Sequence, residues 1–164
     1  MNKRGFLLAE ETLKIILAAI AILFLVYFLF ALYFSSISAE KLRQAESILK
    51  ASLEKSIKIT IERVRSSGTS ESISVPNPTG WYVFGFISDP KPNSCTGKNC
   101  ICICENVGKI VFNFWKSEEE RQVQECGEKG ACLVVEDLKN SFSKEIGKNT
   151  LDLMINFNGG IELR

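Results

Sequence analysis

The sequence predicts an α+β protein with a long N-terminal transmembrane helix, an amphipathic helical stem and an antiparallel β-rich domain stabilised by disulfides. Three observations predict this class: an uncharged apolar run over residues 15–34, a helical apolar repeat after it, and strand-like alternation with six cysteines in the remainder. We therefore expect a transmembrane helix region over 6–34, a helical stem over 35–67 and an extracytoplasmic β-rich domain over 68–164.

The apolar run is long enough to cross a bilayer. It holds 20 consecutive residues without charge, proline or glycine. At about 1.5 Å per residue, a helix of this length spans about 30 Å, the thickness of the hydrocarbon core. A helix also satisfies its own backbone polar groups inside lipid. A secretory signal peptide is the alternative, but its apolar region is shorter, about 7–15 residues. The length favours an anchor.

The charges on the two sides of the run bear on its orientation. Three basic residues precede the run and three lie near its far end: Lys3, Arg4, Lys14, Lys41, Arg43 and Lys50. This count is balanced, and basic residues prefer the cytoplasmic side. Two points favour a cytoplasmic N-terminus: the later bases are spread along a polar helix, and a short tail needs no translocation. We expect a single-pass cell-membrane protein with its C-terminal domain outside the cytoplasm.

The N-terminus carries a short motif made of Lys3, Arg4, Gly5, Phe6 and Glu10. This motif resembles the N-terminus of type IV pilins and their archaeal relatives. In that family a prepilin-type peptidase cuts after the glycine of a short basic leader, which implies a leader over residues 1–5 and a mature chain that begins at Phe6. Glu10 is then the fifth mature residue. The resemblance implies that it pairs with the N-terminal ammonium of a neighbouring copy in a filament, where apolar surroundings strengthen the ion pair.

The first turns also depart from the pilin pattern. Family members usually continue with apolar residues after that glutamate, whereas Glu11, Thr12 and Lys14 follow it here. The alternative is a plain membrane anchor. In that interpretation Lys3 and Arg4 set the topology, and the later charges form an amphipathic turn at the cytoplasmic interface.

The predicted stem has one apolar helical face. Its members recur at spacings of three, four or seven residues: Leu42, Ala45, Leu49, Leu53, Ile57 and Val64. A coiled-coil heptad fails after one repeat, so we expect this face to pack against the following domain. Gly68 is the expected C-cap. Residues 57–61 also alternate like a strand, which leaves open an earlier end of the helix.

Most of the sequence over 68–164 has the residue pattern of β-strands and turns. We interpret 68–80 as a connection and 136–148 as a short helix or an irregular crossing. The expected strands are 81–87, 99–104, 109–115 and 131–136, followed by a hairpin over 151–163 that turns at Asn158-Gly159. The result is one antiparallel sheet with the stem against one face.

The composition excludes several classes of function. The chain has no histidine and a net charge of +1, and the acidic and basic residues beyond the membrane run are equal in number. Histidine-based catalysis is therefore absent, and no basic field attracts nucleic acid. We expect no enzymatic activity and no cofactor. The charged run over 116–128 is interpreted as a loop, and its acidic residues Glu118, Glu119 and Glu120 as a solvated surface rather than a catalytic or calcium site. Trp81 and Trp115 are interpreted as core residues rather than ligand platforms.

The cysteines predict disulfides. They are Cys95, Cys100, Cys102, Cys104, Cys126 and Cys132. In a strand over 100–104 the three cysteines alternate with isoleucines and face one side. Neighbours two apart lie about 6.5–7 Å apart, at the limit for bridging, so each should pair with one of the other three. The connectivity stays open. The alternative, if this domain were cytoplasmic, is a metal or iron–sulfur site.

The cysteine pattern follows the motif Asn77-Pro78-Thr79-Gly80-Trp81 and an N-terminal anchor. Together these features resemble a group of small archaeal membrane-anchored proteins, a resemblance that implies no activity. The sequence favours a structural or adhesive role as a pilin-like subunit. Its expected partners are the lipid bilayer, further copies of itself and a prepilin-type peptidase. A monomeric anchored binding module is the main alternative, and a thiol redox or metal protein is a third.

Overall fold

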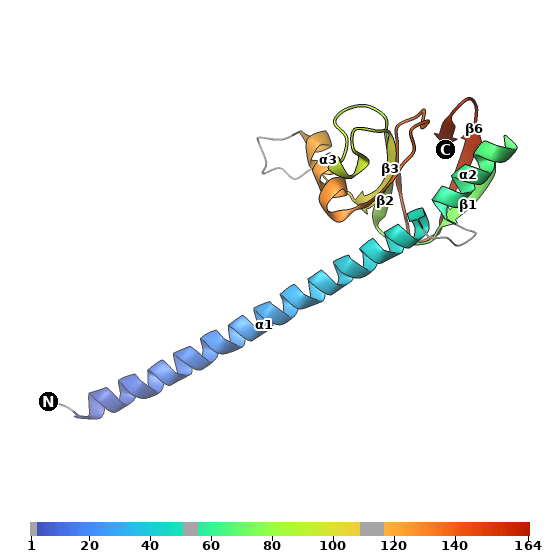
Figure 1. Cartoon of the computed structure of the whole chain (residues 1–164). Coiled ribbons are helices and arrows are strands. Elements are labelled where there is room, and N and C mark those ends of the chain that lie inside the picture. Colours follow the sequence, from blue (N-terminus) through green and yellow to red (C-terminus); the bar gives the residue numbers. More distant parts are fainter. Residues whose placement is uncertain (1–2, 51–55, 109–116) are drawn as a thin grey trace. The chain divides into compact units, whose positions relative to one another are not determined.

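The computed structural model describes residues 3–50, 56–108 and 117–164, and for residues 3–11 it describes the backbone alone. The chain divides into two compact units, Met1–Ala39 and Glu40–Arg164, and each is described by itself. The first unit is helical, and the second combines helices with antiparallel sheets (Figure 1). The predicted α+β class is confirmed.

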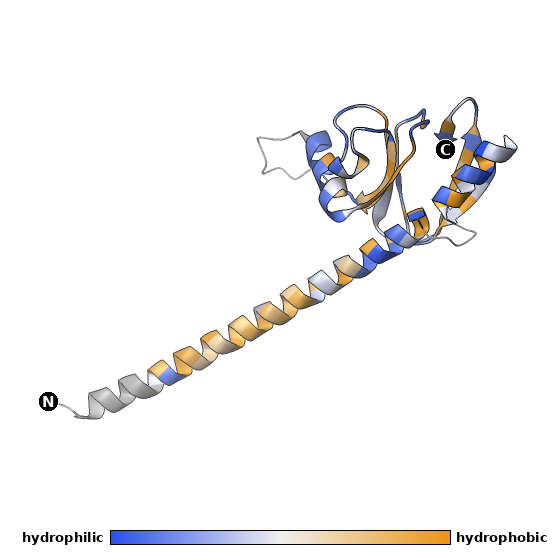
Figure 2. Ribbon diagram, viewed as in Figure 1, coloured by the Kyte–Doolittle hydropathy of each residue, from blue (hydrophilic) through white to orange (hydrophobic). Residues whose placement is uncertain are grey.

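Helix α1 extends from Lys3 to Lys50. Every residue from 12 to 40 is exposed, including large apolar side chains such as Leu23, Phe24 and Tyr27, which are 67–73% exposed. Figure 2 shows this stretch as a nearly unbroken hydrophobic helix. It is long and apolar enough to cross a membrane, as the sequence predicts.

The continuous stem expected over 35–67 is not confirmed. Helix α1 ends at Lys50 and helix α2 covers Ile57–Ser67, while residues 51–55 lie outside the described residues. The side chain of Ser56 accepts a hydrogen bond from the Ile59 amide and caps α2. Gly68, at φ 67°, ends it in the left-handed conformation, as expected for a C-cap. The strand alternative over 57–61 is wrong, because the buried positions follow a helical spacing: Ile57, Thr60, Ile61 and Val64.

Two antiparallel sheets replace the single sheet that we expected. The first has the order β1-β6-β7 and contains β1 (Glu71–Val75), β6 (Leu151–Phe157) and β7 (Ile161–Leu163). The second has the order β4-β3-β2-β5 and contains β4 (Ala131–Val134), β3 (Cys100–Glu105), β2 (Trp81–Phe86) and β5 (Phe142–Glu145). The predicted strands β2, β3 and β4 and the terminal hairpin are confirmed.

Three segments differ from the prediction. The connection over 68–80 contains β1, and the segment 136–148 contains β5 rather than a helix. The charged run that we interpreted as a loop forms helix α3, Glu118–Lys129. A capping box starts this helix, because Ser117 and Glu120 each accept a hydrogen bond from the other's backbone amide. The strand expected over 109–115 lies outside the described residues.

One hydrophobic core is shared by both sheets, α2 and the end of α1. Its buried members are Ala45, Leu49, Ile57, Ile61, Val64, Ile73, Val75, Trp81, Val83, Ile101, Ile103, Ala131, Val135, Leu138, Ile146, Leu153, Ile155, Ile161 and Leu163. Helix α2 packs on β1 and β6 (Figure 1). Helix α3 packs on β3 and β4, and it covers a second, smaller core that contains the cysteines.

The segment after β4 joins the two sheets through hydrogen bonds. The Lys139 amide donates to the Ile161 carbonyl at 2.9 Å. The Asn140 side chain bonds both backbone groups of Leu163, donating to its carbonyl at 2.7 Å and accepting from its amide at 3.1 Å. An amide side chain thus substitutes for a strand neighbour at β7. These bonds fix the position of one sheet against the other within the second unit.

Candidate functional site: a disulfide core beneath helix α3

Strand β3 places its cysteines and its isoleucines on opposite faces. Cys100, Cys102 and Cys104 belong to the smaller core, whereas Ile101 and Ile103 belong to the main core, and all five are fully buried. Successive side chains of a strand point to opposite faces, so the alternating residues of β3 contribute side chains to two different cores. The predicted one-sided arrangement of the cysteines is confirmed.

Three pairs of cysteines lie at disulfide distance. Cys95–Cys100, Cys102–Cys132 and Cys104–Cys126 have Cα–Cα distances of 5.9, 4.1 and 5.1 Å, within or close to the usual range for bridging. Each β3 cysteine therefore pairs with one of the other three, as predicted. The structure adds the connectivity, which the sequence left open.

Each partner cysteine comes from a different element. Cys95 ends the short 3-10 helix η1 (Asn93–Cys95), Cys132 lies on the edge strand β4 opposite Cys102, and Cys126 lies on α3. The first disulfide closes a tight loop onto β3, the second links adjacent strands, and the third fastens α3 to the sheet. No described cysteine is free.

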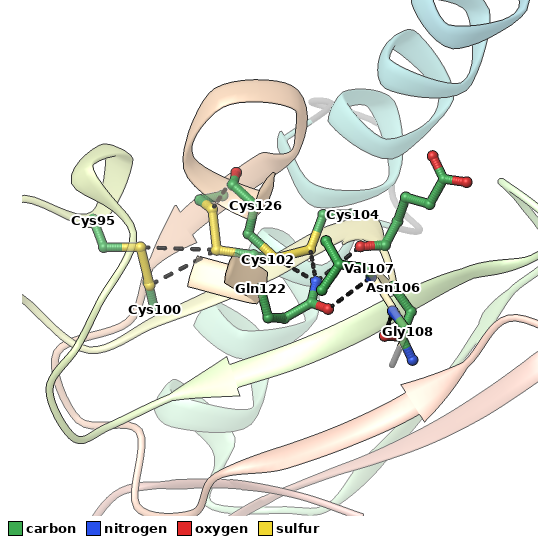
Figure 3. Close-up of a disulfide and its surroundings, with 11 residues drawn as sticks. Cys95, Cys100, Cys102, Cys104, Asn106, Val107, Gly108, Gln122 and Cys126 are labelled. Carbon is green, nitrogen blue, oxygen red and sulfur yellow. Dashed lines mark hydrogen bonds between the residues drawn. A yellow bond between two sulfur atoms is a disulfide. The ribbon is translucent and has the colours of Figure 1, made fainter. Parts of the chain in front are cut away.

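Two of the disulfides are in contact with each other. Sγ of Cys102 lies 3.8 Å from Sγ of Cys95 and 3.9 Å from Sγ of Cys100 (Figure 3). These three sulfur atoms are also the group with the spacing of a metal site within the described residues. Metal-ligating cysteines are thiolates, and the sulfurs of a disulfide are not, so the metal alternative requires a reduced chain.

Gln122 ties α3 to the end of β3. Its side chain is buried; Nε2 donates to the Glu105 carbonyl at 2.8 Å, and Oε1 accepts from the Val107 amide at 3.1 Å. Nε2 also lies 3.5 Å and 3.4 Å from the sulfurs of Cys104 and Cys126 (Figure 3). Sequence reasoning missed this residue. Its position one helical turn before Cys126 would have placed it on the same face of a helix, but we interpreted this segment as a loop.

Aromatic side chains on β2 line the rest of the cysteine face. Tyr82, Phe84 and Phe86 stack in a row with ring centroids 5.8 and 5.9 Å apart. The antiparallel register sets them opposite Cys104, Cys102 and Cys100 respectively. Aromatic rings and sulfur are polarizable and pack favourably, so this row extends the disulfide core along β2.

The remaining predicted residues lie elsewhere. Lys3, Arg4, Gly5, Phe6 and Glu10 belong to the first turns of α1, where the backbone alone is described. Glu118, Glu119 and Glu120 are exposed in the first turn of α3, which confirms the solvated surface and suits the positive end of the helix dipole. Trp81 is only 2% exposed and belongs to the core, as expected, whereas Trp115 lies outside the described residues.

No protein-family model, curated protein or solved structure matches this chain. Two features of the chain itself bear on its function. One is the exposed apolar helix of the first unit, and the other is the buried sulfur cluster of the second. The chemistry of the cluster is that of disulfide formation and thiol–disulfide exchange.

Proposed function

We propose that this protein is a single-pass membrane-anchored structural or adhesive protein of the pilin-like type, with its disulfide-bonded domain outside the cytoplasm. One observation carries the proposal: the same chain combines an exposed apolar helix with a domain in which all six cysteines are paired. The exposed apolar side chains of the helix are stabilised by contact with lipid or protein, and the disulfides persist in an oxidising compartment.

The exposed surface of α1 is the argument for anchoring. Burial of apolar surface stabilises by about 25 cal/mol per Å², so a helix with every residue from 12 to 40 exposed strongly favours transfer out of water. A bilayer provides that transfer along a run of this length. Contact with the apolar helices of neighbouring copies, as in a filament, provides it as well.

The disulfides are the argument for the side of the membrane. Cytosolic thiols are kept reduced, whereas disulfides persist in extracytoplasmic spaces. With the second unit outside, Lys3 and Arg4 lie on the cytoplasmic side, which basic residues prefer; the balanced count of basic residues on the two sides of the run leaves the disulfides as the stronger argument.

The pilin-like role is supported by the order of residues at the N-terminus. A basic pair precedes Gly5, Phe6 follows, and Glu10 stands at the fifth position from Phe6. We propose that a prepilin-type peptidase cuts after Gly5 and that Glu10 pairs with the new ammonium group of a neighbouring copy. Within an apolar filament core such a pair is strongly favoured over either charge alone.

The test is the intact mass of the chain extracted from its native membrane. Processing predicts a mass that lacks Met1–Gly5 and begins at Phe6. A Gly5→Leu variant should then keep the full mass, and an Asn2→Ala variant, which leaves the cleavage position unchanged, should still be shortened. A full-length mass for the unaltered chain would contradict the pilin-like role and leave the anchor.

A monomeric anchored binding module is the second candidate. The charged and polar residues Glu11, Thr12 and Lys14 favour it, because they place polar groups where a filament core is usually apolar. Cross-linking in the native membrane distinguishes the two roles. A filament subunit gives a ladder of oligomers joined through the N-terminal helix, and a binding module gives the monomer alone.

A further inference from the structure

The sulfur of Cys102 lies within reach of two disulfides, its own and that of Cys95–Cys100. We propose that Cys95, Cys100, Cys102 and Cys132 form a thiol–disulfide exchange site that accepts electrons from an external dithiol, such as that of a dithiol oxidoreductase. This role goes beyond anchoring and does not depend on the pilin-like proposal. It rests on three observations: the contact between sulfurs, the position of Cys132 on an edge strand and the spacing of Cys100 and Cys102 along β3.

The contact between sulfurs sets up the exchange. Sγ of Cys102 is 3.8 Å from Sγ of Cys95 and 3.9 Å from Sγ of Cys100. Exchange proceeds by attack of a thiolate on a disulfide sulfur, so a thiolate on Cys102 would already be next to its target. Within the described residues, the sulfurs of the third disulfide contact the Gln122 side chain rather than a sulfur of another disulfide.

The entry point is Cys132. All six cysteines lie among the described residues; Cys132 is 8% exposed, whereas the other five are fully buried. It also lies on β4, which is an edge strand of its sheet. Although Cys132 is itself buried, it is the least buried of the six cysteines and lies at the sheet edge, so we expect an external thiolate to attack the Cys102–Cys132 disulfide at Cys132, with Cys102 as the leaving group.

The exchange consists of three successive displacements at sulfur. A thiolate of the dithiol bonds to Sγ of Cys132, the Cys102–Cys132 bond breaks, and Cys102 leaves as a thiolate. That thiolate bonds to Sγ of Cys95, the Cys95–Cys100 bond breaks, and Cys100 leaves as a thiolate that takes a proton. The second thiol of the reagent then displaces Cys132. The reagent departs as a disulfide, and its two electrons and two protons remain on Cys100 and Cys132.

Strand geometry selects Cys95 rather than Cys100 as the target. Cys100 and Cys102 are two residues apart on one strand, so their Cα atoms are separated by about 6.5–7 Å. This is the upper limit for a disulfide, whereas Cys95 approaches from a separate element, η1. The expected product is therefore a Cys95–Cys102 disulfide with a free thiol on Cys100.

A single substitution tests the exchange without any reductant. In the full-length Cys132→Ser protein, purified in detergent, Cys102 has lost its partner and carries the unpaired thiol. We expect that thiol to move, so that alkylation followed by peptide mapping finds modified Cys100 and a Cys95–Cys102 disulfide. The matched control is Cys126→Ser, in which the unpaired thiol should stay on Cys104 and both other disulfides should keep their native pairing. Modification confined to Cys102 in Cys132→Ser would overturn the proposal.

The unaltered chain provides an independent test that needs no variant to fold. During a graded titration with dithiothreitol, Cys132 and Cys100 should be the first cysteines to become alkylated, while Cys104 and Cys126 remain paired. First modification of Cys104 and Cys126, or of Cys102 together with Cys132, would contradict the exchange site.

Discussion

Gly85 and Phe142 face each other across strands β2 and β5. The absence of a side chain at Gly85 leaves the space in which the Phe142 ring packs. A Cβ atom at Gly85 would lie 2.5 Å from Cε1 and 2.6 Å from Cδ1 of Phe142. The aromatic ring therefore covers the glycine and replaces the packing that its side chain would provide. The glycine is needed here for space rather than for an unusual backbone conformation.

Substitution of Gly85 by alanine should destabilise the second unit. The added methyl group forces the Phe142 ring out of place, and overpacking of this kind costs about 1–3 kcal/mol. The free energy of unfolding of the detergent-solubilised full chain, from urea denaturation followed by tryptophan fluorescence, measures the effect. Gly147→Ala is the matched control, because the nearest atom to its new Cβ lies at 3.9 Å and little change is expected. Equal effects of the two substitutions would contradict the steric explanation.

Gln122 is a second residue with a specific structural role, because its side chain joins α3 to the backbone at the end of β3. Substitution by alanine removes the partner of the Glu105 carbonyl and of the Val107 amide, and each of these part-buried hydrogen bonds contributes about 0.5–1.5 kcal/mol. We expect Gln122→Ala to lower the free energy of unfolding by at least that amount. Gln124→Ala, on the exposed side of the same helix, should change it by less than about 0.5 kcal/mol. An unchanged stability in Gln122→Ala would show that this side chain does not hold α3 to β3.

At the scale of elements, the sequence predicts best where the signal is local. The aromatic and β-branched residues of β2, the alternation of cysteine and isoleucine in β3 and the Asn158-Gly159 turn each specify their element within a few residues. Strand β1 has only Ile73 and Val75 on its buried face, and its partner β6 lies far along the chain, so its pairing was not visible in the sequence. Strand β5 was missed for the same reason.

Helix α3 was missed although its start signal is present in the sequence. Ser117 followed three residues later by Glu120 is the pattern of a capping box, but the run of charges led us to interpret the segment as a loop. The helix matters because it carries Cys126 and Gln122. The connectivity of the disulfides could not be predicted without it, nor without the register that sets Cys102 opposite Cys132.

The contribution of the capping box to the free energy of unfolding should be measurable. Ser117→Ala removes the oxygen that accepts from the Glu120 amide, and the loss of such a cap costs about 0.5–2 kcal/mol. The free energy of unfolding should fall by that amount, and the far-ultraviolet circular dichroism should lose helical signal near the transition. Ser117→Thr keeps the hydroxyl and should retain most of the stability. If Ser117→Ala and Ser117→Thr behave alike, the hydrogen bond does not contribute.

At the scale of the whole molecule, the two units have opposite surface chemistry. From residue 12 onward the helix of the first unit exposes apolar side chains, whereas most of the described apolar residues of the second unit are buried in two cores. The length and composition of the apolar run predicted the first property directly. The division of the second unit into two sheets was not predictable, because it depends on contacts such as those of Asn140 with Leu163, which join distant segments.

The central claim is that the helix anchors this chain with its cysteine-containing domain outside the cytoplasm. The intact mass of the protein tests the location of this domain most directly. Native membranes are solubilised in the presence of a thiol-alkylating reagent, with and without prior reduction, and the mass gives the number of alkylated cysteines. The account predicts that no cysteine is alkylated before reduction and that all six are alkylated after it. Six alkylated cysteines without reduction would place the domain in a reducing compartment and contradict the account.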